Sequence, residues 1–263
     1  MRLYERAAAA PGAETGQGPI WHVEDTRTFF AGPLRYNAGH QHGAPVYLAG
    51  LYSSFRLRVG AGAWTTCRTA MIPAGVVHEL DLGGDPLGVL YVEPEEAGPD
   101  GLVPLMTGTR TEGGALIGSG GETALMRDLY EDRAAAGIAG LALADLLQFA
   151  SARSRRDVDG RIARATALIH ARAGECVPVA ELAEAAGISA SRFQRLFTQE
   201  VGVPYRRYRS WTRMRRAIRA VIEGANLTMA AHEAGFFDQA HLAHDFRKTF
   251  GAPASGSLVG IRR

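Results

Sequence analysis

The sequence predicts an α+β protein of two domains, β-rich in its first half and all-α in its last two fifths. Three observations support this prediction. Short strand-like runs broken by glycines extend to about residue 92, helical spacing of apolar residues begins at about residue 158, and a helix-turn-helix pattern occurs twice near the C-terminus. With 263 residues, 46% of them hydrophobic, the chain is long enough to bury a core in each domain.

The β-rich half begins with residues 1–19, which are rich in Ala and Gly and are expected to form a mobile arm. Gly32-Pro33 predicts a turn. Five further runs are typical of short strands: 46–51, 54–59, 70–72, 76–82 and 87–92. Because these runs are short and closely spaced, they predict a sandwich or barrel. The Gly- and Pro-rich region 94–122 is expected to be a loop that leaves it.

Helical spacing of apolar residues follows over 123–136 and 138–150. The next stretch, ARSRR at 152–156, is short, polar and basic, so we interpret it as a linker.

Residues 189–198, SASRFQRLFT, predict the exposed helix of a first helix-turn-helix unit. Ser189 is a good N-cap, and Phe193, Leu196 and Phe197 have the spacing of a buried stripe. This pattern turns four polar side chains to solvent: Ser191, Arg192, Gln194 and Arg195. Arginine and glutamine carry the groups that read guanine and adenine edges in the major groove of DNA.

The same unit occurs again further along the chain. Ala183, Gly187, Phe193, Phe197 and Gly202 correspond to Ala231, Gly235, Leu242, Phe246 and Gly251. The N-cap Ser189 corresponds to Asp238, and the exit Val203-Pro204 corresponds to Ala252-Pro253. An internal repeat of this kind favours two tandem helix-turn-helix units over an ordinary helical core.

Residues 204–224 predict one long helix that joins the two units. Its apolar stripe consists of Tyr205, Tyr208, Trp211, Met214 or Arg215, Ile218 and Val221. Seven arginines surround the stripe, at positions 206, 207, 209, 213, 215, 216 and 219. They are expected either to contact DNA phosphates or to pair with Glu200 and Glu223. The residues that we assign to phosphate contact are Ser189, Arg206, Arg207, Arg209, Arg247 and Lys248.

Three stretches of this half carry a resemblance to a known family: LAEAAGISASRFQRLFTQEVGVPYRRY, RMRRA and AAHEAGFFDQAHLAHDFRKTFGAP. They are similar to the AraC/XylS family of bacterial transcription regulators, whose DNA-binding domain has two helix-turn-helix units bridged by one helix. The resemblance implies that bases are contacted by Ser191, Arg192, Gln194, Arg195, Gln239, Ala240, His241 and His244. Two features depart from the family: it often has arginine where His244 stands, and its usual Tyr-Arg ending is missing after Pro253.

The β-rich half carries two further motifs: GHQHGAPVY at 39–47 and IPAGVVHEL at 72–80. They resemble the two motifs of cupin barrels, and Pro73, Gly75 and His78 match the second one. In the first motif the expected glutamate is absent, with Val46 or Tyr47 in its place. Sensor domains of the AraC family are commonly cupin-like, which agrees with the resemblance of the C-terminal half.

Together these resemblances imply three parts of the chain. We expect a cupin-like sensor barrel at 1–121, a helical dimerisation segment and linker at 122–156, and an all-α DNA-binding domain at 157–263. In the family, helices in the middle segment often form the dimer contact. Packing of these helices on the barrel of their own chain is the alternative.

Three histidines are candidate metal ligands. His40 and His42 lie two residues apart and are expected on one face of a strand, where a neighbouring strand can bring His78 across to them. Three imidazoles suffice as ligands for Zn, Ni, Cu or Fe with one position left open. The alternative is that these histidines, together with Tyr47, only line a polar ligand pocket.

Charge is distributed unevenly. From Asp157 onward the chain has 16 Arg or Lys residues and 10 Asp or Glu residues, a net charge of +6, whereas the residues before it have 13 and 17, a net charge of −4. A basic domain carried by an acidic one is typical of a DNA-binding module with a separate sensor. Cys67 and Cys176 cannot form a disulfide framework, and we expect neither a signal peptide nor a membrane span, so the cytoplasm is the expected compartment.

The function expected from these observations is sequence-specific regulation of transcription, not catalysis. The expected partners are double-stranded DNA, a small-molecule or metal effector, RNA polymerase and a second copy of the chain, with no membrane. One rival is a cupin metalloenzyme with an accessory helical tail, which would need Tyr47 or Glu79 for proton transfer; the missing glutamate argues against it. A second rival is a DNA-binding protein whose barrel only dimerises and binds no ligand.

Overall fold

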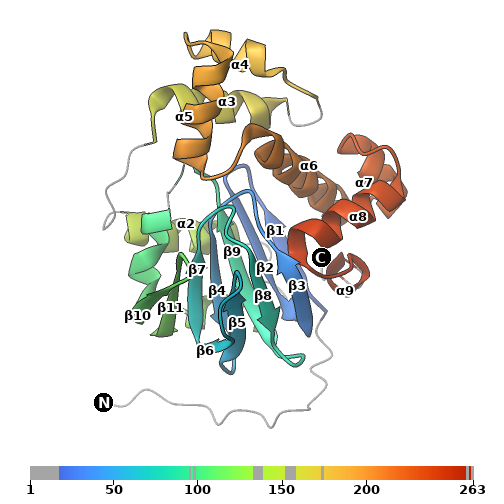
Figure 1. Cartoon of the computed structure of the whole chain (residues 1–263). Coiled ribbons are helices and arrows are strands. Elements are labelled where there is room, and N and C mark those ends of the chain that lie inside the picture. The colour runs from blue at the N-terminus through green and yellow to red at the C-terminus, as the bar shows by residue number, and fades with distance from the viewer. Residues whose placement is uncertain are drawn as a thin grey trace.

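The computed structural model describes residues 18–94, 96, 99–132, 139–151, 158–172, 175–258 and 261. A β-rich N-terminal domain and a helical C-terminal domain lie against each other (Figure 1), which confirms the predicted two-domain α+β class. Most of the predicted arm and the whole predicted linker lie outside the described residues. Within the described part of the chain, no helix combines the length and the apolar character needed to cross a lipid bilayer.

The N-terminal domain consists of two antiparallel sheets. The larger sheet has the order β1-β2-β9-β4-β7-β11-β10 and the smaller one has the order β3-β8-β5-β6. The larger sheet is built from β1 Ile20–Val23, β2 Arg27–Pro33, β4 Val46–Gly50, β7 Thr69–Ile72, β9 Pro86–Val92, β10 Met106–Glu112 and β11 Ala115–Gly121. The smaller sheet is built from β3 Tyr36–His40, β5 Phe55–Val59, β6 Thr65–Cys67 and β8 His78–Asp81.

Buried and outward-facing residues alternate along β5, which shows how the smaller sheet packs against the core. Phe55, Leu57 and Val59 are buried, whereas Arg56 and Arg58 point outward. The apolar residues have the period of two that places one face of a strand against a core. The two sheets therefore enclose apolar side chains between them, and we call this two-sheet unit the barrel.

The prediction of a loop over 94–122 is wrong for most of that region. After the 3-10 helix η1 at Pro99–Leu105, the strands β10 and β11 form a hairpin, and β11 pairs with β7 at the edge of the larger sheet. Gly113 and Gly114 make the hairpin turn, both with positive φ, as two-residue hairpin turns require. Threonines and glycines in these strands hide the apolar alternation, so pairing with β7 decides their structure.

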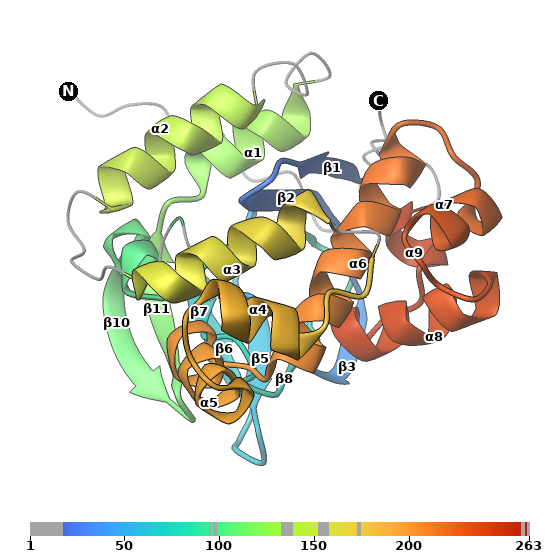
Figure 2. The ribbon, with the colours of Figure 1, turned by 90° about the horizontal axis from the view of Figure 1, so that it is seen from above.

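Two helices cover the outer face of the larger sheet (Figure 2): α1 at Ala124–Glu131 and α2 at Ala139–Ser151. Met126 and Tyr130 of α1 and Leu143 and Leu147 of α2 are buried in a core that also contains Phe29 of β2. These helices pack on the barrel of their own chain, which was one of the two predicted roles. The dimer contact stays a prediction.

The C-terminal domain contains two helix-turn-helix units bridged by α6. Its helices are α3 Gly160–Ala171, α4 Val179–Ala185, α5 Ala190–Val201, α6 Tyr205–Ile222, α7 Leu227–Glu233, α8 Gln239–Phe250 and α9 Ser255–Leu258. Gly187 and Gly235 occupy the two turns with φ of 65° and 74°, a backbone conformation that favours glycine. The predicted helical domain is thus confirmed.

The apolar core is continuous between the two domains. A single cluster of buried residues contains Val89 and Tyr91 of β9 together with Trp211 of α6 and Phe246 and Phe250 of α8. The helical domain therefore sits on the barrel through buried side chains, with α6 and α8 at the contact (Figure 1).

Candidate functional site

Helix α5 presents the candidate base-reading residues of the first unit. Its N-cap, the side chain of Ser189, accepts a hydrogen bond from the backbone N of Arg192 at 3.4 Å. Phe193 and Phe197 bury the opposite face of the helix. All four candidate residues are exposed: Ser191, Arg192, Gln194 and Arg195. This face of α5 is therefore exposed to solvent.

Helix α8 has the same construction in the second unit. Asp238 caps it by accepting a hydrogen bond from the backbone N of His241 at 2.7 Å. The candidate base-reading residues Gln239, Ala240, His241 and His244 are exposed. Phe237, directly before the cap, is 84% exposed. No sequence pattern marks this aromatic ring, although it lies beside the candidate DNA-facing residues.

Most candidate phosphate-contacting residues line one groove of about 790 Å³ between α6, α8 and the barrel. Arg206, Arg207, Arg209 and Lys248 all contribute to it. The opposite wall is formed by barrel residues, including Val77 and residues of the loop after β3. Of the two candidates outside this lining, Ser189 caps α5 and Arg247 is exposed on α8. A basic surface and the β-rich domain therefore share one groove.

Four of the seven arginines of α6 have partners inside the protein instead. Arg209 donates a hydrogen bond to Cys176 Sγ, and Arg219 pairs with Asp25 at 3.2 Å. Arg213 donates hydrogen bonds to the carbonyls of Ala234 and Gly235 and lies 4.2 Å from the ring centre of Phe236. Arg215 is buried against the barrel. Phosphate contact therefore stays a prediction for Arg206 and Arg207, nearer the start of the helix.

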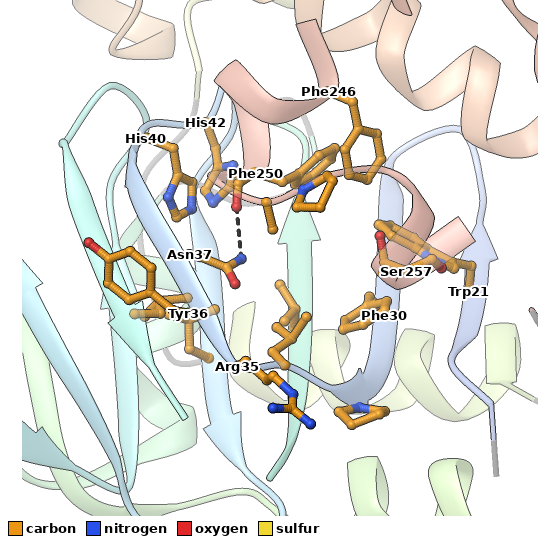
Figure 3. A pocket seen from close by; sticks show the side chains of 18 of the residues that line it. Trp21, Phe30, Arg35, Tyr36, Asn37, His40, His42, Phe246, Phe250 and Ser257 are labelled. Carbon is orange, nitrogen blue, oxygen red and sulfur yellow. Dashed lines mark hydrogen bonds between the residues drawn. The ribbon is translucent and has the colours of Figure 1, made fainter. Parts of the chain in front are cut away.

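A second cavity, of about 480 Å³, lies between the barrel and the end of the helical domain (Figure 3). Its walls are mainly apolar, with Phe30, Leu48, Val89 and Tyr91 from the barrel and Phe246, Phe250 and Pro253 from the helical domain. Its polar lining includes Arg35, Asn37, His40 and His42. The cavity thus suits a largely apolar small molecule with one polar end.

Hydrogen bonds tie the two walls of this cavity together. Asn37 Nδ2 donates to the carbonyl of Phe250 at 2.7 Å, the dashed line in Figure 3, and the backbone N of Ala38 donates to the carbonyl of Gly251 at 2.9 Å. On the other side, Trp21 Nε1 donates to the carbonyl of Ser257 at 2.8 Å. A molecule in the cavity therefore contacts both domains at the point where they are joined.

Tyr47, which the sequence argument placed in the ligand pocket, lies elsewhere. Its hydroxyl donates hydrogen bonds to the carbonyls of Leu105 and Glu122, in the core beneath α1 and α2. Successive residues of a strand face opposite sides of a sheet, and Val46 and Leu48 face the barrel interior. The pocket assignment of Tyr47 is corrected accordingly.

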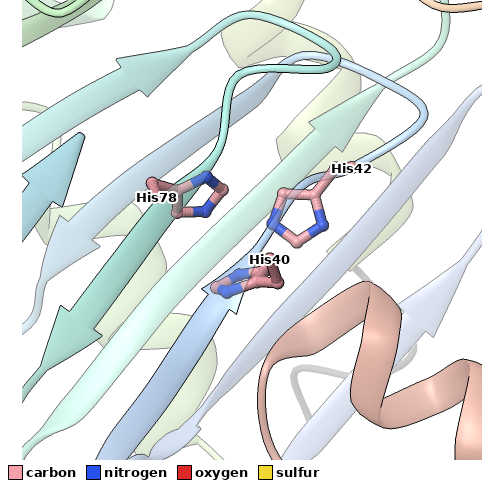
Figure 4. Close-up of side chains that lie close together, drawn as sticks. All are labelled: His40, His42 and His78. Atoms are coloured by element: carbon pink, nitrogen blue, oxygen red, sulfur yellow. The ribbon is translucent and has the colours of Figure 1, made fainter. Parts of the chain in front are cut away.

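The three histidines do lie together (Figure 4). His40 ends β3 and is directly opposite His78 of β8, whereas His42 follows in the loop after β3 and not on the strand itself. The ring centres of His40 and His78 are 4.2 Å apart, and that of His42 lies 4.9 and 5.0 Å from them. Their ligand nitrogens all lie within 4.8 Å of one another. A cross-strand pair plus one loop residue thus forms a three-histidine cluster.

Burial keeps the cluster uncharged. It lowers the pKa of His40 to about 4 and that of His78 to about 3, and it holds the pKa of His42 well below its ordinary value. All three rings are therefore neutral imidazoles at pH 7, the form that can hold a metal ion.

Glu93, directly after β9, is the centre of a buried hydrogen-bond network that was not predicted from the sequence. Its carboxylate accepts hydrogen bonds from Tyr208 Oη at 2.7 Å, from Trp211 Nε1 at 2.8 Å and from Arg215 Nη1 at 2.8 Å. Arg215 also donates to Thr28 Oγ1 at 2.9 Å and to backbone carbonyls before β2. Within the sequence, a lone glutamate before a proline carried no signal, although the arginine on the stripe of α6 did.

A comparison with known protein families supports the prediction of helix-turn-helix units in the C-terminal half. Residues 182–256 match a family model described as a helix-turn-helix domain. Among curated proteins, none matches the sequence significantly.

Solved structures of ToxT from Vibrio cholerae share the fold of the whole chain. Apo ToxT K231A from strain SCE256 is 10% identical, with a TM-score of 0.60 over 89% of this chain and 97% of that one. Wild-type ToxT from the same strain, bound to an unsaturated fatty acid, is 10% identical, with a TM-score of 0.58 over 92% and 99%. ToxT from strain O395 bound to (E)-4-(8-methylnaphthalen-1-yl)but-3-enoic acid is 8% identical, with a TM-score of 0.56 over 89% and 98%.

The family match and the fold likeness agree with each other. The first covers both helix-turn-helix units, and the second extends across the β-rich domain. The chain therefore carries a C-terminal helix-turn-helix domain behind a β-rich N-terminal domain, and it shares the two-domain fold of ToxT.

Proposed function

We propose that this protein is a sequence-specific DNA-binding transcription regulator whose DNA affinity is set by a ligand held between its two domains. One observation carries the proposal: two capped helices, α5 and α8, expose candidate base-reading side chains in tandem units joined by the arginine-rich α6. Such units dock in successive major grooves about 34 Å apart. RNA polymerase and a second copy of the chain are further proposed partners.

The cavity between the domains is the proposed effector site. The ligands named for ToxT, an unsaturated fatty acid and a naphthyl-butenoic acid, are both carboxylic acids with an apolar body. The cavity here has apolar walls from both domains and an exposed arginine, Arg35, at its edge (Figure 3). We therefore propose an apolar monocarboxylic acid as effector, with its carboxylate towards Arg35.

A metal ion at the three histidines is a second candidate controller, because His40 and His42 also line this cavity. Catalysis is less well supported. The side chain of Glu79 is held by Arg58 Nη2 at 2.5 Å and by Tyr36 Oη at 2.6 Å, and Tyr47 belongs to the other core. The two groups that a cupin metalloenzyme would need for proton transfer thus have other partners.

The test is a footprint and a gel shift on the promoter region of its own gene, with and without oleic acid. We expect protection of two successive major grooves and a change of affinity with the acid but not with its methyl ester. Arg35→Gln should remove the response to the acid, whereas Arg56→Gln, on the outer face of the barrel, should keep it. Absence of any specific protection would contradict the proposed function.

A further inference from the structure

We propose that His40, His42 and His78 bind one divalent transition-metal ion, and that helix α8 of the DNA-binding domain helps to hold its ligand set. The metal site follows from the chemistry of the cluster and does not depend on the proposed function. Control of DNA affinity by the metal does rest on it.

Two of the histidines are oriented as metal ligands usually are. His40 Nδ1 lies 2.7 Å from the carbonyl of Ala38, and His78 Nδ1 lies 3.0 Å from the carbonyl of Val76. A ring nitrogen that donates to a backbone carbonyl fixes the tautomer and leaves the Nε2 lone pair of each ring for a metal. His78 Nε2 is buried and has no hydrogen-bond partner.

The third histidine is held from the other domain. The imidazole of His42 lies close to the backbone of Thr249 on α8, and its buried Nδ1 has no hydrogen-bond partner. Its ring also packs 6.2 Å from Trp211 and 5.9 Å from Phe250, measured between ring centres. Nδ1 of His42 is therefore available for a metal, and residues of the DNA-binding domain help to position its ring.

The size of the cluster fits a metal ion after small rotations. Nitrogens bound to one tetrahedral zinc ion at 2.0–2.1 Å lie about 3.3 Å from one another. The ligand nitrogens here lie within 4.8 Å of one another, so closure requires shifts of roughly 1 Å per ring, within the reach of side-chain torsions. Closure around a metal ion would give a partner to two buried nitrogens that have none, and a buried polar atom without a partner is energetically costly.

The cluster also leaves room for a further ligand. His40 and His42 line the cavity between the domains, and His40 lines the basic groove as well. Three neutral imidazoles do not compensate the charge of a divalent ion. The remaining position would therefore take an anion, either hydroxide from solvent or a carboxylate in the cavity.

The close contact between the end of α8 and the histidine cluster allows the role of α8 to be tested by mutation. A Cβ built on Gly251 would lie 2.7 Å from His40 Nδ1 and 2.2 Å from the carbonyl O of Ala38, and the φ of Gly251 is 71°. Gly251→Ala should therefore push the end of α8 away from the histidines. Gly256→Ala is the matched control, because a Cβ there meets nothing within 4 Å.

The experiment is titration of the full-length, chelator-treated protein with Zn²⁺, Ni²⁺ and Co²⁺, followed by calorimetry and by the visible spectrum of the cobalt form. We expect one ion per chain, loss of binding in His78→Ala and in His42→Gln, and normal binding in His232→Ala, which lies on the exposed face of α7. Gly251→Ala should weaken the affinity by about 10- to 100-fold, as loss of support around a ligand does elsewhere, and Gly256→Ala should leave it unchanged. Circular dichroism establishes that each variant is folded.

Each outcome tests a different part of the proposal: the metal site, the role of α8 or control of DNA affinity by the metal. Absence of stoichiometric metal in the folded parent protein, or equal binding in His78→Ala, overturns the metal site. Metal bound equally well by folded Gly251→Ala overturns the role of α8. A gel shift with zinc-loaded and zinc-free protein is read separately. Metal that binds without changing a specific shift contradicts metal control alone, whereas absence of any specific shift contradicts the proposed function and leaves the metal site standing.

Discussion

The carboxylate of Glu93 and the guanidinium of Arg215 form a buried ion pair across the domain boundary, with Oε1 and Nη1 2.8 Å apart. Both side chains are almost completely buried, at 1% and 6% exposed. A buried ion pair contributes little to stability compared with an apolar pair, but removal of one partner leaves the other charge uncompensated.

Glu93→Gln should therefore lower the free energy of unfolding by about 3–5 kcal/mol. The control is Asp25→Asn, which removes the partner of Arg219 in a pair where the aspartate is 87% exposed; it should change stability by less than about 1 kcal/mol. Urea unfolding measures both. A Glu93→Gln protein as stable as Asp25→Asn would show that the ion pair does not hold the domains together.

The second prediction concerns the close approach of the barrel to α6. A Cβ on Gly43 would lie 2.4 Å from the Cβ of Trp211, which is itself buried. Gly43→Ala should therefore cost about 1–3 kcal/mol, because two backbones must separate. Gly160→Ala, near the start of α3 with nothing within 4 Å of the new Cβ, should be neutral or stabilise the protein by up to about 1 kcal/mol. Thermal unfolding of both variants gives the comparison, and equal melting temperatures would refute the close contact.

A third prediction separates base reading from phosphate contact. Arg195→Ala, on the exposed face of α5, should weaken binding to the specific site by about 1–3 kcal/mol and relax discrimination there. Arg206→Ala, which lines the basic groove, should weaken binding to all sequences alike and lower the slope of log K against log salt by about 1. Fluorescence anisotropy with specific and scrambled duplexes at several salt concentrations measures both effects. Arg195→Ala that discriminates like the parent protein would remove Arg195 from base reading.

The two cysteines should differ in reactivity. Burial raises the pKa of the Cys67 thiol to about 12, so at pH 8 it stays protonated, whereas Cys176 is exposed. Because only the thiolate reacts, iodoacetamide should label Cys176 first and Cys67 only when the smaller sheet opens. Mass spectrometry after timed labelling follows each site. Equal rates in the folded protein would mean that β6 is open to solvent.

The local parts of this fold could be predicted from the sequence. Phe193 and Phe197 recur at helical spacing behind a capping serine, and their repeat at Leu242 and Phe246 doubles the signal. The three histidines could also be grouped, because a strand pair brings His78 opposite His40. In both cases the determining contacts are close in sequence or follow from one strand pairing.

The contacts between the domains could not be predicted in this way. Whether Tyr47 faced the barrel interior or the outer face depended on a register of one residue. Glu93 has partners that lie more than a hundred residues away, and no local pattern marks it. The hairpin of β10 and β11 depends on the free edge of β7, which the Thr- and Gly-rich sequence of that region does not reveal.

The glycines where barrel and helices meet have a consequence for protein engineering. Gly43, Gly75 and Gly251 each leave no space for a Cβ beside an atom of the other domain. An N-terminal domain grafted from a protein of similar fold would bring its own loop residues to these places. Such a chimera would then pack poorly at the domain boundary even if each half folded correctly. When domains are exchanged, the loops after β3 and β7 should therefore be transferred together with α6 and α8.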